Sequence, residues 1–174
     1  MNVAYDVPAR QFAGWGTFRR HVRALGRVVS RADAYSPLPP ERAELWSGYG
    51  RWDEVYFPSL VGLVVEEVRI DYCRMRLPWR RELTQPAGLV HGGVLATLLD
   101  SVAVPAIGAG YDERRKFATL DLQIQFLGAV QNEDMVVEGW VTRRGRSIVF
   151  CEAEVATASG RPVAKGMLTF RVLG

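Results

Sequence analysis

Residues 91–107 form the one long apolar stretch of helical length in this chain of 174 residues. Strand-like segments surround it. The clearest is 118–126, where Leu120, Leu122 and Ile124 alternate with polar residues in the period of two typical of a strand. Others lie at 61–65, 72–77, 135–142, 148–155 and 163–172. A single helix among antiparallel strands predicts an α+β domain, in which a sheet of five to six strands wraps around the central helix.

The sequence before this domain has a different pattern. Between residues 12 and 29 apolar residues recur every three or four positions with arginines between them, which predicts an amphipathic helix. Pro40 suits a first helical position, so residues 41–47 are expected to form a short second helix. We therefore divide the chain into a helical N-terminal extension, 1–50, and a main domain, 51–174.

The composition favours a globular protein in a reducing compartment. Apolar residues make up 48% of the chain and charged residues 24%, and no stretch reaches the roughly 20 apolar residues of a membrane-spanning helix. The first residues lack the basic and apolar regions of a signal peptide. Cys73 and Cys151 are too isolated to form a disulfide framework or a metal-spaced pair. We expect a cytoplasmic protein without a metal site.

The net charge of +3 is concentrated near the start of the chain, where residues 1–35 contain six arginines and two aspartates. Such a segment could contact nucleic acid, an anionic membrane or a phosphorylated ligand. A solvated helix face explains the same charges more simply. We expect no nucleic-acid or membrane partner.

The run His91-Gly92-Gly93 opens the predicted central helix. The first backbone N–H groups of a helix have no partner within it and lie at the positive end of the helix dipole. Glycine lets another molecule approach them closely, so a carbonyl placed there would be polarised and a developing oxyanion stabilised. The alternative is that Gly92 and Gly93 only permit close packing of the loop on the helix.

Asp100 interrupts the apolar part of the same helix. A carboxylate in apolar surroundings usually has a specific partner, a raised pKa or a catalytic task, because desolvation of the charge is costly. A helix face that is open to solvent at this turn is an equally simple explanation.

The spacing of these groups points to two chains. His91 and Asp100 are nine positions apart, or roughly 13 Å along a helix axis, so one water molecule cannot contact both within one subunit. If both act on one carbonyl, the helix start of one chain faces the helix middle of another, and a two-fold dimer contains two such sites.

Residues 62–173 resemble the PaaI-like acyl-CoA thioesterases of the hotdog-fold superfamily. The resemblance rests on His-Gly-Gly at 91–93, the acid nine residues after His91, and the order of the strands. The matching segments are 63–68, 88–96, 119–127, 143–146 and 164–170. The family implies a hotdog fold, a homodimer or a tetramer built as a dimer of dimers, and an acyl-CoA substrate whose coenzyme A is the only cofactor-like group.

The resemblance also implies roles for individual residues. Gln85 helps to hold the carbonyl or the attacking water, and the Gly92 N–H polarises the thioester carbonyl, with Gly93 beside it. Asp100 of a partner subunit acts as general base or nucleophile, Thr119 places the water, and His91 orients the loop.

Two further expectations come from residue chemistry and not from roles that the family implies. Arg143, Arg144 and Arg146 lie on one predicted hairpin and are candidates for the phosphates of coenzyme A, although an exposed, merely solvated hairpin fits them as well. Pro105 is unusual inside the long helix and is expected to kink or end it.

Three other functions are compatible with such a fold. A hydratase or dehydratase acting on acyl thioesters would carry a Gly-Asp-x-Asn-Pro-x-His type of loop, which the sequence lacks. A non-catalytic acyl-CoA sensor fits the basic N-terminus but has little use for Asp100. A purely structural module does not explain an acid within an apolar helix.

Overall fold

The computed structural model describes residues 30–173 of the chain. The chain divides into two compact units, Met1–Ala34 and Tyr35–Gly174. The described part of the first unit contains a short 3-10 helix, η1 (Arg31–Ala34). The helix predicted for 12–29 lies outside the described residues.

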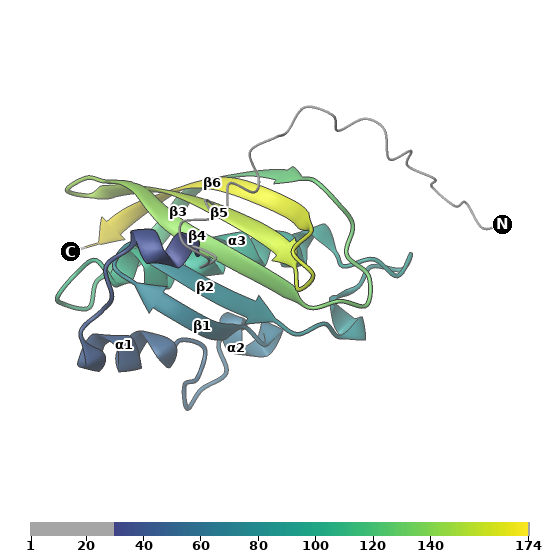
Figure 1. Ribbon diagram of the computed structural model, residues 1–174, viewed down its shortest axis with the longest axis horizontal. Helices are drawn as coiled ribbons and strands as arrows, with labels where there is room; N and C mark the ends of the chain where they lie inside the picture. Colours follow the sequence, from purple (N-terminus) through teal and green to yellow (C-terminus); the bar gives the residue numbers. More distant parts are fainter. Residues whose placement is uncertain (1–29, 174) are drawn as a thin grey trace, which may run out of the picture. The chain divides into compact units, whose positions relative to one another are not determined.

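The second unit is built on one antiparallel sheet of six strands, in the order β1-β2-β4-β5-β6-β3 (Figure 1). The strands are β1 (Val64–Arg69), β2 (Tyr72–Leu77), β3 (Lys116–Phe126), β4 (Met135–Arg144), β5 (Ile148–Thr157) and β6 (Pro162–Leu173). Two strands therefore precede the long helix and four follow it, which confirms the predicted α+β class and order of elements.

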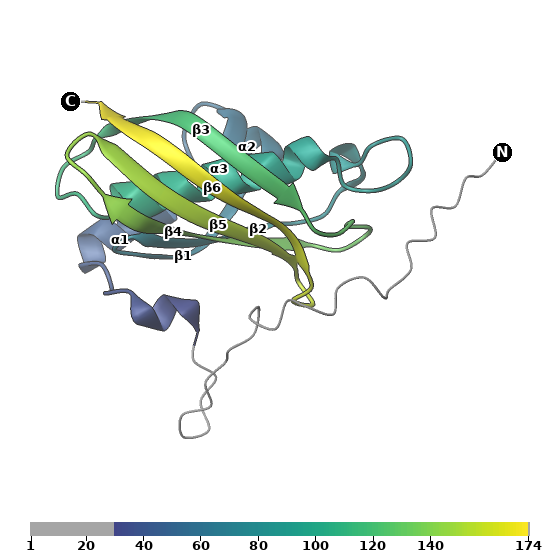
Figure 2. The same cartoon turned by 90° about the horizontal axis from the view of Figure 1, so that it is seen from above.

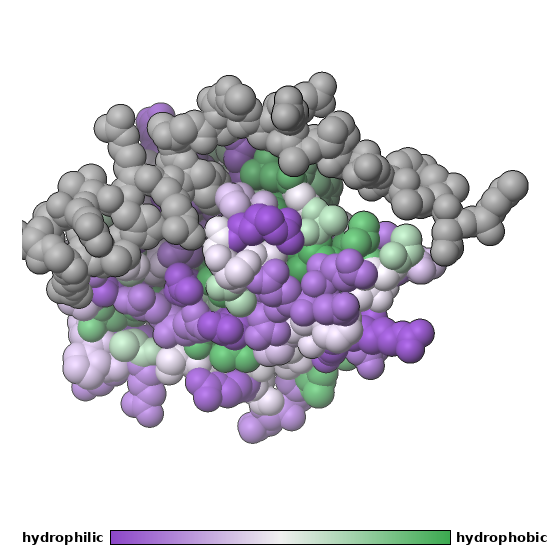
Figure 3. Space-filling view, turned by 45° about the vertical axis from the view of Figure 1, so that its right-hand side comes forward, coloured by the Kyte–Doolittle hydropathy of each residue, from purple (hydrophilic) through white to green (hydrophobic). Residues whose placement is uncertain are grey.

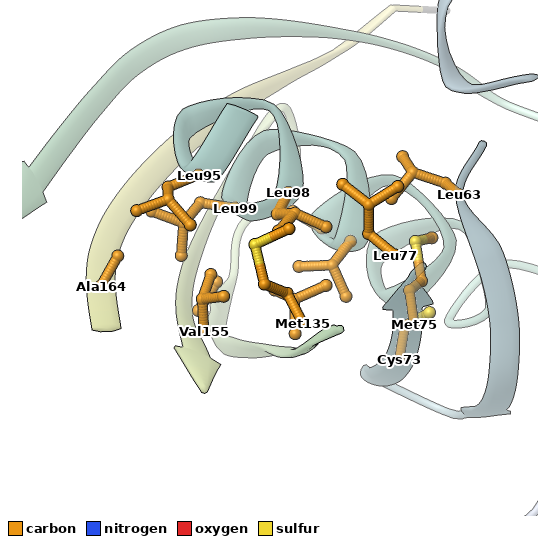
Figure 4. Packing of buried hydrophobic residues seen from close by; sticks show 14 of the residues in the cluster. Leu63, Cys73, Met75, Leu77, Leu95, Leu98, Leu99, Met135, Val155 and Ala164 are labelled. Carbon is orange, nitrogen blue, oxygen red and sulfur yellow. The ribbon is translucent and has the colours of Figure 1, made fainter. Parts of the chain in front are cut away.

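The long helix α3 (Gly92–Gly108) crosses the inner face of this sheet, which curves around it as in the hotdog fold (Figure 2). Leu95, Leu98 and Leu99 project from the helix towards residues such as Met135 and Val155 of β4 and β5 (Figure 4). Burial of these side chains supplies the main stabilising free energy, about 1.5–3 kcal/mol for each large apolar side chain. Because α3 is hydrophobic on nearly all sides, only the sheet can cover so much of its surface.

Helix α3 continues through Pro105 and ends at Gly108, so of the two expected effects, a kink or an end, the proline does not end the helix at its own position. The carbonyl of Pro105 accepts a hydrogen bond of 2.8 Å from the Ala109 N–H, which completes the last turn. Proline removes only its own N–H from the helix, and the tight packing of its neighbours holds this turn in place.

Strand β1 begins later than the sequence suggested. The predicted strand segment 61–65 contains the end of a short helix, α2 (Phe57–Val61), followed by Gly62 with a left-handed φ of 88°. Glycine adopts this conformation without the penalty that a side chain would incur, so the helix stops here and the chain turns into β1. The chain turns between β1 and β2 at residues 70–71, where Asp71 has a φ of 65°.

The alternation predicted for 118–126 is broken by an irregularity in β3. The register with β6 shifts between Thr119 and Asp121, so Leu120 is an extra residue and is 56% exposed. A bulge of this kind reverses which side chains face the helix. Phe117 and Thr119 face α3 before it, and Leu122 faces the core after it.

The segment before β1 belongs to the same unit as the sheet. Helix α1 (Pro40–Ser47) begins at the expected proline and packs against β1 (Figure 1). Before it, Tyr35 stacks on Tyr72 with ring centroids 5.2 Å apart, and Pro37 forms an isolated bridge with Arg69. The division of the chain at residue 50 into an extension and a catalytic domain stays a prediction.

Hydrophilic residues make up most of the coloured surface visible in Figure 3, with smaller hydrophobic areas among them. Within residues 30–173 no helix has the length and apolar character to cross a membrane. Cys73 and Cys151 are buried free thiols, and burial raises the pKa of Cys151 to about 12.

Candidate functional site

The start of α3 is capped by the side chain of His91. Its Nδ1 accepts a hydrogen bond of 2.9 Å from the Gly93 N–H, and its backbone is extended, as is usual at an N-cap. A Cβ at Gly93 would lie 2.9 Å from the same nitrogen, so a larger residue would displace the imidazole. His91 therefore caps the helix start, and its capping nitrogen must carry a free lone pair.

The capping contact leaves Gly92 as the free donor. Its N–H has no hydrogen-bond partner within the part of the chain that the structure describes. A Cβ at this position would contact the ring of Phe126 at 3.4 Å, so the aromatic side chain borders the amide. The helix dipole and the vacant N–H make this a suitable place for a carbonyl oxygen that gains negative charge.

Gln85 lies in the loop that leads into this helix. Its side-chain oxygen accepts a hydrogen bond of 2.6 Å from the Ala87 N–H, and its backbone exchanges hydrogen bonds with Gly88 and Leu89. The side chain thus stabilises the turn before His91. Only its NH₂ group is left to contact a substrate.

Asp100 lies on the one stripe of α3 that the sheet does not bury. This stripe comprises Gly93, Thr97, Asp100 and Val104, which follow one another at helical spacing and are all at least partly exposed. The carboxylate accepts a hydrogen bond of 2.8 Å from Thr119 Oγ1. The structure thus brings together two residues that were predicted separately from the sequence.

The bulge in β3 makes the contact between Thr119 and Asp100 possible. In an uninterrupted strand Thr119 would alternate with Ala118 and share a face with Asp121 and Gln123. The extra residue Leu120 lets Thr119 face the helix while the later residues keep their own alternation. Sheet irregularities of this kind often redirect a side chain next to a functional site.

Tyr49 is a third residue near Asp100, and sequence reasoning did not identify it. Its half-buried ring packs against the hydrophobic core. Burial, and then the negative charge of Asp100, raise the pKa of Tyr49 well above its ordinary value. The phenol therefore stays protonated beside the carboxylate. No local pattern around residue 49 could have indicated this, because the contact is long-range in sequence.

The two halves of the candidate site are separated within one chain. Gly92 and Asp100 are eight positions apart on a straight helix, which corresponds to about 12 Å. Phe126 borders the first and Thr119 the second, so β3 runs antiparallel to α3 between them. A single reacting carbonyl group therefore cannot contact both groups of the same subunit.

The three arginines near the β4–β5 hairpin differ in their surroundings. Arg144 donates hydrogen bonds to Asp71 and, at 3.0 Å, to the Ile107 carbonyl near the end of α3. Its guanidinium also lies 4.4 Å from the centre of the Tyr111 ring. Arg144 thus stabilises the C-terminal end of the helix, whereas Arg143 and Arg146 are exposed and face solvent.

A groove of about 450 Å³ lies on the outer face of the sheet, away from α3. Its lining comes from strands β3 to β6 and includes Gln123, Trp140, Glu152, Lys165 and Met167. None of the predicted site residues borders it. Among residues 30–173 no cluster of histidine, cysteine and acidic side chains could hold a metal ion.

Comparisons with known proteins place the chain in a family. Residues 87–164 match the family model described as the thioesterase superfamily, a range that contains Gly92, Asp100 and Thr119. A candidate esterase of Halobacterium salinarum is 30% identical over 125 residues, which are 66% of this chain and 82% of that protein. The acyl-coenzyme A thioesterase 13 of Homo sapiens is 26% identical over 99 residues, 56% of this chain and 69% of that protein.

A solved structure shows the same fold. A conserved protein from Pseudomonas aeruginosa superimposes with a TM-score of 0.64 at 31% sequence identity, covering 69% of this chain and 95% of that chain. The similarity in sequence and the common sheet-around-helix architecture support one conclusion: the chain belongs to the thioesterase superfamily of hotdog-fold proteins.

Proposed function

We propose that this protein hydrolyses the thioester bond of an acyl-CoA, giving the free acid and coenzyme A. The observation that carries the proposal is the hydrogen bond of 2.8 Å between Thr119 and Asp100 on the uncovered stripe of α3. The same helix begins with an unpaired N–H at Gly92. The name of the human relative, an acyl-coenzyme A thioesterase, supports an acyl-CoA as the substrate class.

The Gly92 N–H binds the thioester oxygen in this mechanism. As a nucleophile attacks the carbonyl carbon, the oxygen gains a full negative charge, and the N–H together with the helix dipole stabilises it. Gly93 allows the substrate to approach, and the Gln85 NH₂ group holds the carbonyl or the water. His91 keeps the helix start in place through its bond to the Gly93 N–H.

Asp100 supplies the basic group. As a general base it takes a proton from water, whose oxygen attacks the carbonyl; the tetrahedral intermediate then expels the thiolate, which is protonated to coenzyme A. As a nucleophile its carboxylate attacks the carbonyl and expels the thiolate, which leaves as coenzyme A; water then hydrolyses the resulting mixed anhydride to the free acid and regenerates Asp100. In both routes the Thr119 hydroxyl donates its hydrogen to one carboxylate oxygen. The lone pairs of the same hydroxyl are then available to accept a hydrogen bond from the water.

A two-fold homodimer joins the two halves of the site. An axis near the middle of the span from Gly92 to Asp100 brings Gly92 of one protomer next to Asp100 of its partner. The same axis passes near the middle of β3, an edge strand whose outer backbone groups are available for pairing. A tetramer built from two such dimers retains both sites.

In the proposed dimer, the arginines of the β4–β5 hairpin lie where they can bind the phosphates of coenzyme A. Arg144 contacts the carbonyl of Ile107, seven positions beyond Asp100, so the β4–β5 hairpin lies near the end of α3. In the dimer the hairpin of one protomer extends past the Gly92 amide of the other. We therefore assign the phosphates of coenzyme A to Arg143 and Arg146, with Arg144 holding the hairpin in position.

The central test is the substitution Asp100→Asn, which keeps the shape of the side chain and removes its basicity. We expect kcat/KM for acyl-CoA hydrolysis to fall at least about 100-fold, as is usual when a general base is lost. The remaining acyl-CoA is measured by chromatography, and circular dichroism checks the fold.

Asp121→Asn is the matched control, because this carboxylate is on the same strand as Thr119 but points away from α3. Its activity should stay within about twofold of wild type. Undiminished turnover in Asp100→Asn would refute the role of Asp100, and binding of acyl-CoA without hydrolysis by the wild-type protein would favour a sensor.

A further inference from the structure

The segment from α1 to β1 runs along α3 in the opposite direction. Trp46 packs so closely on Gly108, the last residue of α3, that a Cβ there would lie 2.2 Å from its ring. Three residues further on, Tyr49 packs against the core, within range of the charge of Asp100, which lies about two turns before Gly108. Further on, the Leu60 carbonyl accepts a hydrogen bond of 2.7 Å from Arg80, in the connection that leads to His91. The two views agree, since α1 lies near the end of α3 and α2 nearer its start (Figures 1 and 2).

Three aromatic rings along this segment are in contact with one another. The rings of Tyr49 and Trp52 meet edge to face with centroids 5.1 Å apart, and those of Trp52 and Tyr56 meet in the same way at 5.4 Å. Edge-to-face pairs at these distances hold the rings in a fixed orientation. They form a continuous apolar row, here called the aromatic row, from the candidate catalytic carboxylate outwards.

The outer part of this row is exposed, together with its apolar neighbours. Trp52 is 37% exposed and Tyr56 53%, and Val55, Phe57 and Leu60 are each more than half exposed. Connecting segments are usually polar, and contiguous exposed apolar residues commonly mark a binding surface. The free energy cost of this exposure is relieved when an apolar ligand covers the row.

We propose that the aromatic row binds the acyl group of the substrate and makes the enzyme selective for long, apolar acyl chains. This inference rests on the proposed thioesterase function. A thioester whose carbonyl is next to Asp100 has its acyl chain free to extend past Tyr49 and along Trp52 and Tyr56. Each methylene placed on the row then gains about 0.8 kcal/mol, or roughly fourfold in binding.

The acyl chain suits this surface better than a second copy of the protein does. In the proposed dimer the second copy pairs along β3, whereas the aromatic row precedes β1. Strands β3 and β1 form the two opposite edges of the sheet. Asp100 interacts with both segments, because Thr119 of β3 donates a hydrogen bond to it and its charge acts on Tyr49, which precedes β1. A chain that starts at the carboxylate can therefore reach the row.

The test compares acetyl-, butyryl-, octanoyl- and palmitoyl-CoA as substrates of wild type, Trp52→Ala and Tyr56→Ala. In wild type we expect kcat/KM to rise with chain length. Each substitution should lower kcat/KM for octanoyl- and palmitoyl-CoA at least about tenfold, mainly through KM, and change the value for acetyl-CoA less than about twofold. Tyr56→Ala alters a more exposed residue and so tests the row even if Trp52→Ala folds poorly.

Met167→Ala is the control, because Met167 is a similarly exposed apolar residue on the outer face of the sheet. It should leave the whole chain-length profile unchanged. Sedimentation velocity follows the oligomeric state of each variant.

The outcomes separate the two proposals. If wild type hydrolyses no acyl-CoA, the proposed function fails and the inference fails with it. If wild type is active but the row variants lose activity equally on all chain lengths, or dissociate into smaller oligomers, only the acyl-binding row is overturned.

Discussion

At the scale of single residues, Thr119 is the hydrogen-bond partner of the proposed catalytic carboxylate. It donates to one oxygen of Asp100 and leaves the second oxygen free for a water proton. Thr119→Val keeps the shape and removes this hydrogen bond. Because a hydrogen bond to a charged group contributes about 1.5–3 kcal/mol, we expect kcat to fall at least about tenfold. Steady-state kinetics on an acyl-CoA measures the change.

Thr119→Ser is the conservative counterpart and should retain most of the wild-type kcat, because serine can donate the same bond. Equal losses in the valine and serine variants would show that packing of the methyl group matters and the hydroxyl does not.

Individual site residues were predictable from sequence only where a motif marks them. His91, Gly92 and Asp100 belong to one short run, and their helix and its cap form as the sequence indicates. Phe126 and Tyr49 were missed, since each is brought to the site by tertiary packing. Nothing in the sequence near either residue distinguishes it from an ordinary core aromatic.

At the scale of elements, the extra residue in β3 was the main feature that the sequence concealed. The alternation of apolar and polar residues predicts one uninterrupted strand, and Leu120 fits that pattern. A bulge depends on the pairing with β6, which no local pattern specifies. The number and order of strands were predictable, because apolar periodicity and turn residues are local properties.

The outer face of β1, β2 and β4 carries an ion-pair network centred on Glu66. Arg74 and Arg76 donate hydrogen bonds of 2.8 and 2.6 Å to its two oxygens. Burial alone would raise the pKa of Glu66, but these hydrogen bonds outweigh it and hold the pKa below the ordinary value of 4.5. The network therefore stabilises the fold above that pH and loses its effect as pH falls through the lowered pKa.

Glu66→Gln should thus lower the free energy of unfolding at pH 7 by about 1 kcal/mol or less, because the pair is partly exposed. The difference from wild type should shrink below pH 4.5, where the native carboxylate of wild type becomes protonated. Urea denaturation at pH 7, 5, 4 and 3 measures both values. Glu44→Gln, at an exposed site on α1, provides a baseline; a difference that persists at pH 3 would contradict the linkage.

At the scale of the whole molecule, the separation of Gly92 from Asp100 predicts that two chains complete each site. Gly92→Pro removes the N–H while fitting the first position of a helix, where proline is well tolerated. Asp100→Ala removes the base. A mixed dimer of the two variants has one site with both groups intact. Random mixing gives about half mixed dimers, so roughly a quarter of wild-type activity should return.

Two affinity tags, one on each variant, isolate the mixed dimers for the assay. Each variant mixed only with itself is the negative control. Verified mixed dimers that remain inactive would show that each chain works alone and that α3 or its surroundings must rearrange during the reaction.

The sequence suggests the proposed shared site only through spacing. Positions along a helix convert directly into distance, so the gap between His91 and Asp100 follows from their residue numbers alone. The path of the segment before β1 cannot be derived from residue numbers, because it depends on how α1 packs against β1.

The burial of both sulfurs has a practical consequence for work on this protein. Cys73 and Cys151 are enclosed by the core, and burial raises the pKa of both thiols, so neither is present as a reactive thiolate near neutral pH. Ellman's reagent added to a reaction mixture should then report only the sulfhydryl that turnover liberates. A slow additional colour, reaching two equivalents per chain, would time the opening of the folded core and so reveal denaturation during the assay.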